Sequence, residues 1–122
     1  MYVKIEKSFS TPEVIIQDGK IEIKGRSIPE DSFEFYLPVI ENVTKYLEQN
    51  NESTEVIIYL EYINSSSKKF LTNILNLLEK SYLNGTKIEI TWQYDEDDES
   101  ICDLGNDLKS FIKIPIYMKE II

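Results

Sequence analysis

Alternating polar and apolar residues mark the first strands of the chain. Lys20–Lys24 alternates polar and apolar side chains, which is the pattern of a strand with one buried face. An apolar run, Val14–Ile16, precedes it, and Asp18-Gly19 lies between the two runs. Glycine adopts positive φ at little cost, so Asp-Gly between two β-type runs favours a tight turn. The pattern predicts a β-hairpin over residues 14–25.

A helical pattern follows. Asp31 with Glu34 three residues later resembles a capping box, in which each side chain satisfies a free backbone amide. Apolar residues then recur at helical spacing up to about Gln49, at Tyr36, Ile40, Val43 and Leu47. Pro38 lacks a backbone donor and disfavours a helix interior. We therefore expect an irregular turn first and a regular helix from about Tyr36.

The middle of the chain predicts a central strand and a second helix. Glu55–Ile63 is nearly continuous in β-branched and aromatic residues, which is typical of a strand covered on both faces. Asn64–Lys68 follows directly. An amphipathic helix comes next and closes at Asn84-Gly85, a C-cap signal; its apolar face holds Leu71, Ile74, Leu75, Leu78 and Tyr82.

The last third predicts a strand over Lys87–Trp92 and an acidic loop over Asp95–Glu99. A shorter helix interrupted at Gly105 follows, with apolar residues Ile101, Leu104, Leu108 and Phe111. Ile114–Met118 is the last predicted strand, and Pro115 indicates that it lies at a sheet edge. The order is β-β-α-β-α-β-α-β. It predicts an α/β fold in one domain over residues 1–122, with a single small mixed sheet and about three helices packed on it.

Composition limits the partners. The chain has 122 residues, the size of one domain, and its formal net charge of −9 repels nucleic-acid phosphates and anionic lipid. We therefore expect neither nucleic acid nor membrane as a partner, and expect docking on basic or mixed protein surfaces. The one cysteine, Cys102, allows no internal disulfide. With no apolar leader and no apolar run near the ~20 residues of a membrane span, we expect a cytoplasmic protein.

The residue types exclude most catalytic sites. Histidine is absent, which removes the usual general base near neutral pH and Ser-His-Asp and Cys-His catalysis. With only one cysteine as well, the chain has no ordinary zinc site. None of the four glycines belongs to a phosphate-binding loop. We expect no enzyme, no cofactor and no metal site. A hydrolase that uses carboxylates and Mg²⁺ remains the open alternative.

The acidic segment Asp95–Glu99 is the one place in the sequence where a metal could be considered. It lacks the spacing and the central glycine of a calcium-binding EF-hand loop. A solvated loop that brings negative charge to a helix N-terminus accounts for it simply. A loop that docks on a protein and a metal site are the other interpretations.

Asn64-Ser65-Ser66-Ser67 is more informative, because it lies where the central strand passes into a helix. Asn and Ser side chains accept hydrogen bonds from free helix amides, an interaction worth about 1 kcal/mol. Capping needs one such residue, and the sequence has four in a row. A phosphate here would meet exposed amides and a favourable dipole, so the fold should tolerate it and the surface should change.

These segments together resemble the SiaC family of bacterial regulatory phosphoproteins, whose fold is similar to STAS domains and anti-sigma factor antagonists. No single segment carries the resemblance; their order and spacing along nearly the whole chain do. The segments are Ser10–Pro12, Gly25–Asp31, Leu60–Lys68, Trp92–Glu99 and the late Pro115.

The resemblance implies that Ser65 is phosphorylated by a partner protein kinase and dephosphorylated by a metal-dependent serine/threonine phosphatase. Ser66 and Ser67 are weaker candidates, as caps or kinase contacts. The unphosphorylated form would bind an effector, which is a diguanylate cyclase in the best-known system, acting in cyclic di-GMP signalling and biofilm formation. The residues expected to contact partners are Asn64, Lys68, Asp95, Glu96, Asp97, Asp98 and Glu99.

Two alternatives stay open at this point. In one, the chain is a constitutive scaffold or interaction domain whose serine turn only caps a helix. In the other, the chain is a small carboxylate-dependent metal hydrolase with its ion near Asp95–Glu99.

Overall fold

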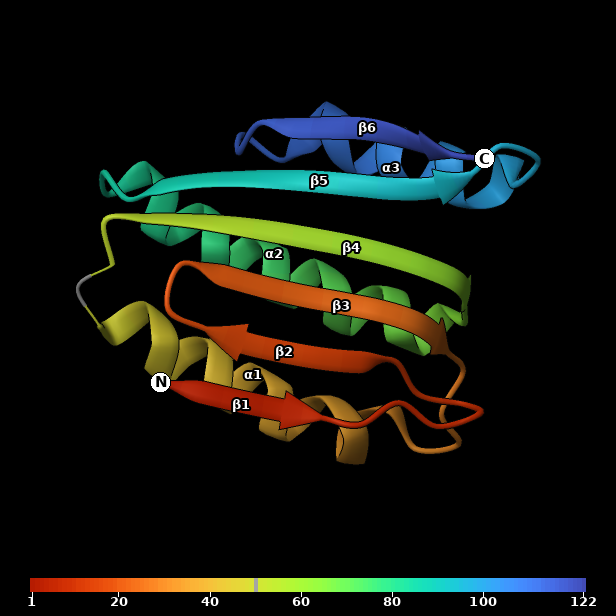
Figure 1. Cartoon of the computed structure of the whole chain (residues 1–122), viewed down its shortest axis with the longest axis horizontal. Coiled ribbons are helices and arrows are strands. Elements are labelled where there is room, and N and C mark those ends of the chain that lie inside the picture. Colours follow the sequence, from red (N-terminus) through yellow and green to blue (C-terminus); the bar gives the residue numbers. More distant parts are fainter. Residues whose placement is uncertain (50) are drawn as a thin grey trace.

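Strands and helices alternate through most of the chain in the computed structural model, which describes residues 1–49 and 51–122 (Figure 1). The strands are β1 (Tyr2–Ile5), β2 (Glu13–Gln17), β3 (Lys20–Ser27), β4 (Ser53–Ile63), β5 (Lys87–Asp95) and β6 (Ile116–Ile121). The helices are α1 (Ser32–Glu48), α2 (Ser65–Leu83) and α3 (Glu99–Phe111). The predicted α/β class is confirmed, and so are the three helices on one mixed sheet.

The strands lie in the sheet in the order in which they occur in the chain, from β1 to β6. The pairs β1·β2 and β2·β3 are antiparallel, and the pairs from β3 to β6 are parallel. Each parallel connection contains one helix. Because the strand order never reverses, right-handed connections place every helix on the same face. Figure 1 shows all three helices behind the sheet.

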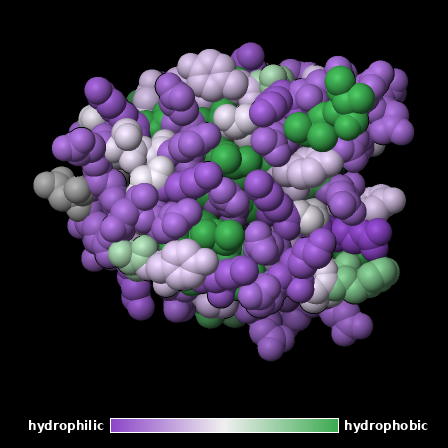
Figure 2. Space-filling view, viewed as in Figure 1, coloured by the Kyte–Doolittle hydropathy of each residue, from purple (hydrophilic) through white to green (hydrophobic). Residues whose placement is uncertain are grey.

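This arrangement corrects one expectation for the central strand. Thr54, Val56, Ile58 and Leu60 of β4 are buried against the helices, whereas the residues that alternate with them are partly or fully exposed. The strand is covered on one face and not on both. The other face of the sheet is open, and Figure 2 shows that hydrophilic residues cover most of it. Lys20 and Lys24, for example, pair there with Glu22 at 3.0 and 3.6 Å.

The strand order needs a second correction, because β1 precedes the predicted hairpin. Val3 pairs with Ile16 and Ile5 with Val14, so β1 extends the sheet by one antiparallel strand. Four residues at a sheet edge carry little periodic signal of their own, and β2 supplies the pairing partner. The observed order is β-β-β-α-β-α-β-α-β.

Helix α1 begins earlier than predicted. Asp31 is its N-cap and accepts a hydrogen bond from the Glu34 amide at 3.0 Å, as the capping box predicts. The helix is regular from Ser32 and contains Pro38. Pro38 lies on the exposed side, where the lost hydrogen bond leaves a carbonyl near solvent, and its own carbonyl accepts from Asn42 Nδ2 at 2.8 Å.

Gly105 does not interrupt α3; the prediction of a break there is wrong. A Cβ built at Gly105 would lie 2.5 Å from the indole ring of Trp92, which is fully buried and donates to the Ile101 carbonyl at 3.0 Å. Glycine lets the helix approach the sheet at this point. The last strand is also later than predicted, starting after Pro115, and it does lie at the sheet edge. Among the described residues, no helix is long and apolar enough to cross a membrane.

Gly105→Ala tests this packing. Alanine favours helix by about 1 kcal/mol over glycine, but forcing a methyl group into a filled site costs about 1–3 kcal/mol. We expect a net loss in the free energy of unfolding, measured by urea denaturation. The exposed neighbour serves as the control, and Asn106→Ala should change stability by less than about 0.5 kcal/mol. A more stable Gly105→Ala would contradict the close approach.

Candidate functional site

Three helices begin at one edge of the sheet. The strands β3, β4 and β5 run parallel, and each passes into a helix at its carboxyl end. The N-caps of the three helices are Asp31, Asn64 and Asp98. In open α/β sheets, ligands and partners bind at this edge because free backbone amides and loop side chains gather there.

Asn64 fixes the serine turn, which we define as residues 64–67. Its side-chain Oδ1 accepts a hydrogen bond from the backbone amide of Ser67 at 2.9 Å, and its backbone amide donates one to the Ser27 carbonyl at 2.9 Å. Its Nδ2 donates to the Pro29 carbonyl at 3.4 Å. One side chain therefore caps α2 and ties it to the loop before α1, so the capping interaction does not require the three serines.

The three serines differ in their surroundings. Ser67 is fully buried, so a kinase cannot reach its hydroxyl in this conformation. Ser66 is exposed, but its Oγ bonds to Ser32 Oγ at 2.6 Å and to Asn64 Oδ1 at 3.3 Å. Ser65 is exposed, and its hydroxyl has no hydrogen bond to any part of the chain that the structure describes. Only Ser65 combines access with an unengaged hydroxyl.

Aromatic contacts join α1 and α2 within the first two turns of each helix. Phe70 stacks on Tyr36 with ring centroids 5.5 Å apart, and Phe33 lies 6.4 Å from Phe70. The Tyr36 hydroxyl pairs with the buried Ser27 hydroxyl. Burial raises the pKa of Tyr36, so the phenol stays neutral at physiological pH. The beginning of α2 is therefore packed on the beginning of α1.

The acidic segment divides into structural and exposed parts. Asp95 is the last residue of β5, which runs further than predicted, and it accepts a hydrogen bond from the Tyr59 hydroxyl; this bond raises the pKa of Tyr59 to about 12. Asp98 caps α3 by accepting from the Ile101 amide at 3.1 Å. Glu96, Asp97 and Glu99 are exposed. Within residues 1–49 and 51–122, no group of three or more ligating side chains could hold a metal ion.

Arg26 lies near the end of β3, beside the acidic segment. Its Nε lies 3.3 Å from Glu61 Oε2, and its guanidinium carbon lies 4.9 Å from the Phe9 ring and 5.4 Å from the Tyr62 ring. With Asp97 and other carboxylates it lines a shallow depression of about 400 Å³; the lining is Arg26, Glu61, Tyr62, Asp95, Asp97 and Asp98.

The sequence prediction missed Arg26 and its aromatic neighbours. One signal was available, since Arg26 is the only arginine in the chain and directly follows Gly25, whose φ is +125°. A register shift at Gly25–Arg26 turns the end of β3 and brings Arg26 opposite Tyr62.

Comparisons with known proteins find similar proteins over most of the chain. Residues 5–121 match the family described as SiaC family regulatory phosphoprotein. An uncharacterised protein of Pseudomonas aeruginosa strain UCBPP-PA14 is 31% identical over 99 residues, which span 81% of this chain and 79% of that protein.

Solved structures of SiaC from Pseudomonas aeruginosa have the same fold. The apo form is 26% identical, with a TM-score of 0.87 over 98% of each chain. A crystal structure of the diguanylate cyclase SiaD in complex with its activator SiaC matches with 28% identity and a TM-score of 0.89, over 98% of this chain and 99% of that one.

Asn64→Ala tests how far one side chain holds the serine turn. Loss of the cap should lower the free energy of unfolding by about 0.5–2 kcal/mol, measured by urea denaturation. Asn64→Asp keeps the acceptor oxygen of the cap and loses only the Nδ2 donor, so its free energy of unfolding should fall much less than that of Asn64→Ala. The two variants thus separate the cap from the bond to Pro29. Equal losses of unfolding free energy in the two variants would show that the bond to Pro29 stabilises the turn more than the cap does.

Proposed function

The chain belongs to the SiaC family of regulatory phosphoproteins, and on this premise we propose that phosphorylation of Ser65 controls whether a partner binds the serine turn. The observation that carries the proposal is the exposed and unengaged Ser65 hydroxyl, beside an engaged Ser66 and a buried Ser67. A kinase needs an accessible hydroxyl that is free to attack, and Ser65 offers one.

The charges at the three helix N-termini also favour Ser65 as the residue that is phosphorylated. Asp31 and Asp98 cap α1 and α3, and each of these helices has a glutamate in its first turn. Helix α2 has the neutral cap Asn64 and no acidic residue in its first turn, which contains the exposed Lys68. A phosphate on Ser65 would meet an uncompensated dipole, an interaction worth about 0.3–1 kcal/mol for a charge at an exposed helix end.

Phosphorylation should therefore change the surface and leave the fold intact. It replaces a neutral hydroxyl by a group of about −1.5 to −2 charge with three acceptor oxygens. A partner that packs closely on the hydroxyl would have to bury this dianion, which costs several kcal/mol unless the partner supplies matched cations. We propose that the unphosphorylated form is the one that binds.

We propose three kinds of partner: a protein kinase, a metal-dependent phosphatase that reverses it, and a diguanylate cyclase as the effector. The effector assignment is supported by the relative SiaC, which is the activator of the diguanylate cyclase SiaD. Asn64, Lys68 and the acidic segment are the contacts we propose. The chain acts in the cytoplasm, where the kinase finds ATP, and has no catalytic role of its own.

Intact mass spectrometry tests the phosphorylation site. We expect one added phosphate when the wild-type chain is incubated with ATP and the kinase of its source bacterium, and none on Ser65→Ala. Ser66→Ala is the matched control and should still gain one phosphate. Full phosphorylation of Ser65→Ala would refute the assignment.

The effect on the effector is tested with Ser65→Asp and Ser65→Asn, which differ in charge at nearly constant shape. Calorimetric titration with the diguanylate cyclase of the same bacterium should show at least tenfold weaker binding for Ser65→Asp than for Ser65→Asn. The free energies of unfolding of the two variants, measured by urea denaturation, should agree within about 1 kcal/mol, because the charge changes the surface and not the fold. Equal binding by both variants would favour a constitutive scaffold.

A further inference from the structure

Two lysines lie one turn after Ser65 on helix α2. Lys68 follows it by three residues and Lys69 by four, and both side chains are exposed. Residues three and four apart on a helix are neighbours on its surface, and long side chains lean back towards the helix N-terminus. Both ammonium groups can therefore reach the Ser65 side chain from within the same helix.

This spacing distinguishes Ser65 from the other two serines of the turn. Only Ser65 has a lysine both three and four residues later. The residue four after Ser66 is Phe70, and both residues at this spacing from Ser67 are apolar. The lysine pair therefore favours the same serine as the unengaged hydroxyl does, on an independent observation.

The two lysines have no carboxylate of their own. No Asp or Glu occurs three or four residues before or after Lys68 or Lys69. In the described part of the chain neither lysine forms an ion pair, although the sequence has 22 acidic and only 13 basic residues. The beginning of α2 therefore has a local excess of positive charge, which an anion on Ser65 would neutralise.

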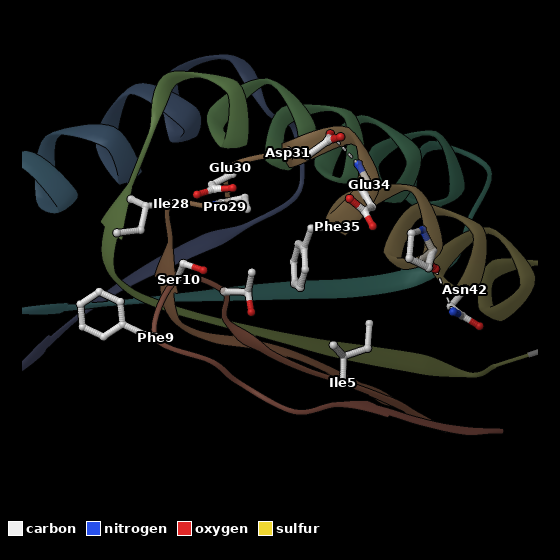
Figure 3. A pocket seen from close by; sticks show the side chains of 12 residues that line it. Ile5, Phe9, Ser10, Ile28, Pro29, Glu30, Asp31, Glu34, Phe35 and Asn42 are labelled. Atoms are coloured by element: carbon white, nitrogen blue, oxygen red, sulfur yellow. Dashed lines mark hydrogen bonds between the residues drawn. The ribbon is translucent and has the colours of Figure 1, made fainter.

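The neighbouring elements at this edge supply mostly negative charge. Glu30, Asp31 and Glu34 lie together at the beginning of α1, where Figure 3 shows the cap that joins Asp31 to Glu34. The segment 95–99 after β5 adds only carboxylates. Arg26 at the end of β3 is already paired with a glutamate at 3.3 Å. Among these neighbours, only α2 offers unengaged cations to a phosphate in the serine turn.

We propose that a phosphate on Ser65 is held by Lys68 and Lys69 in a clamp within helix α2, and that this clamp keeps the phosphate dianionic at neutral pH. The inference rests on the proposed function, since it concerns the phosphorylated form of the same residue. Hydrogen bonds between ammonium groups and phosphate oxygens are charge-assisted, and these are roughly twice as strong as neutral ones. An anion that precedes a lysine by four residues is also the favourable order, because it agrees with the helix dipole.

The clamp matters because the protein is acidic. The second pKa of a phosphoserine is about 6, and a net charge of −9 raises this pKa because negative surroundings disfavour the dianion. Without the lysines, part of the phosphorylated chains would carry a single negative charge near neutral pH. With the lysines, the phosphate keeps both charges. These charges balance the two ammonium groups, so phosphorylation changes this part of the surface from cationic to neutral.

Phosphoserine placed at position 65 of the full chain by stop-codon suppression tests the clamp without a kinase. The test variant is Lys68→Gln/Lys69→Gln. The matched control is Lys87→Gln/Lys113→Gln, which removes two exposed lysines at the opposite edge of the sheet and changes the net charge equally. A phosphorus NMR titration should give a second phosphate pKa about 0.3–0.7 lower in the parent chain, which keeps all four lysines, than in the test variant. The control should match the parent within about 0.1, because salt screens distant charges.

Thermal unfolding distinguishes the clamp from a general loss of charge. Four chains are compared: the parent and the test variant, each with serine or with phosphoserine at position 65. The lysine substitutions should lower the melting temperature by about 1–5 °C more when the phosphate is present than when it is absent. All four substituted lysines are exposed, so the variants should fold.

The outcomes separate the clamp from the proposed switch. Equal phosphate pKa values in the parent and the test variant would overturn the clamp, and so would lysine substitutions that have the same thermal effect with and without phosphate. If the kinase does not modify Ser65 while the pKa difference is present, the switch fails and the clamp stands. If the chain with phosphoserine at position 65 does not fold, both proposals fail.

Discussion

The parallel pairing of β3, β4 and β5 is the constraint on which the site depends. Parallel strands place all their carboxyl ends at one edge, so the three helices must begin there. The strand order has no reversal, so all three helices also lie on one face. The serine turn, Arg26 and the acidic segment are distant in sequence, and they share this edge only because of the sheet topology.

Local signals predicted much of the fold. Asp18-Gly19 predicted the hairpin, because Gly19 takes the positive φ of +82° that the turn requires. The capping box at Asp31 predicted the observed start of α1, whereas the later start expected from Pro38 was wrong. Features that depend on distant residues were missed: β1 needs β2 beside it, and Gly105 is explained only by the Trp92 ring. The one-sided cover of β4 follows from topology, which no single segment reveals.

The sequence indicated the serine turn as a candidate site, but local physics did not indicate which of its residues is modified. Four consecutive polar residues at a strand-to-helix boundary indicated a site, and only a family resemblance distinguished Ser65. The structure adds a physical difference, since Ser66 is engaged by Ser32, which is 34 residues earlier in the chain, and Ser67 is buried. Both differences come from α1 packing on α2, a tertiary contact that a sequence window does not contain.

The distribution of negative charge also bears on the proposed phosphorylation of Ser65 in so acidic a protein. With a net charge of −9, an added dianion should in general be unfavourable, and at α1 or α3 it would meet an aspartate cap and a first-turn glutamate. Helix α2 is the exception among the described helices, because its cap is neutral and Lys68 and Lys69 follow. Of the three helix N-termini that the structure describes, only that of α2 has neither an acidic cap nor an acidic residue in its first turn.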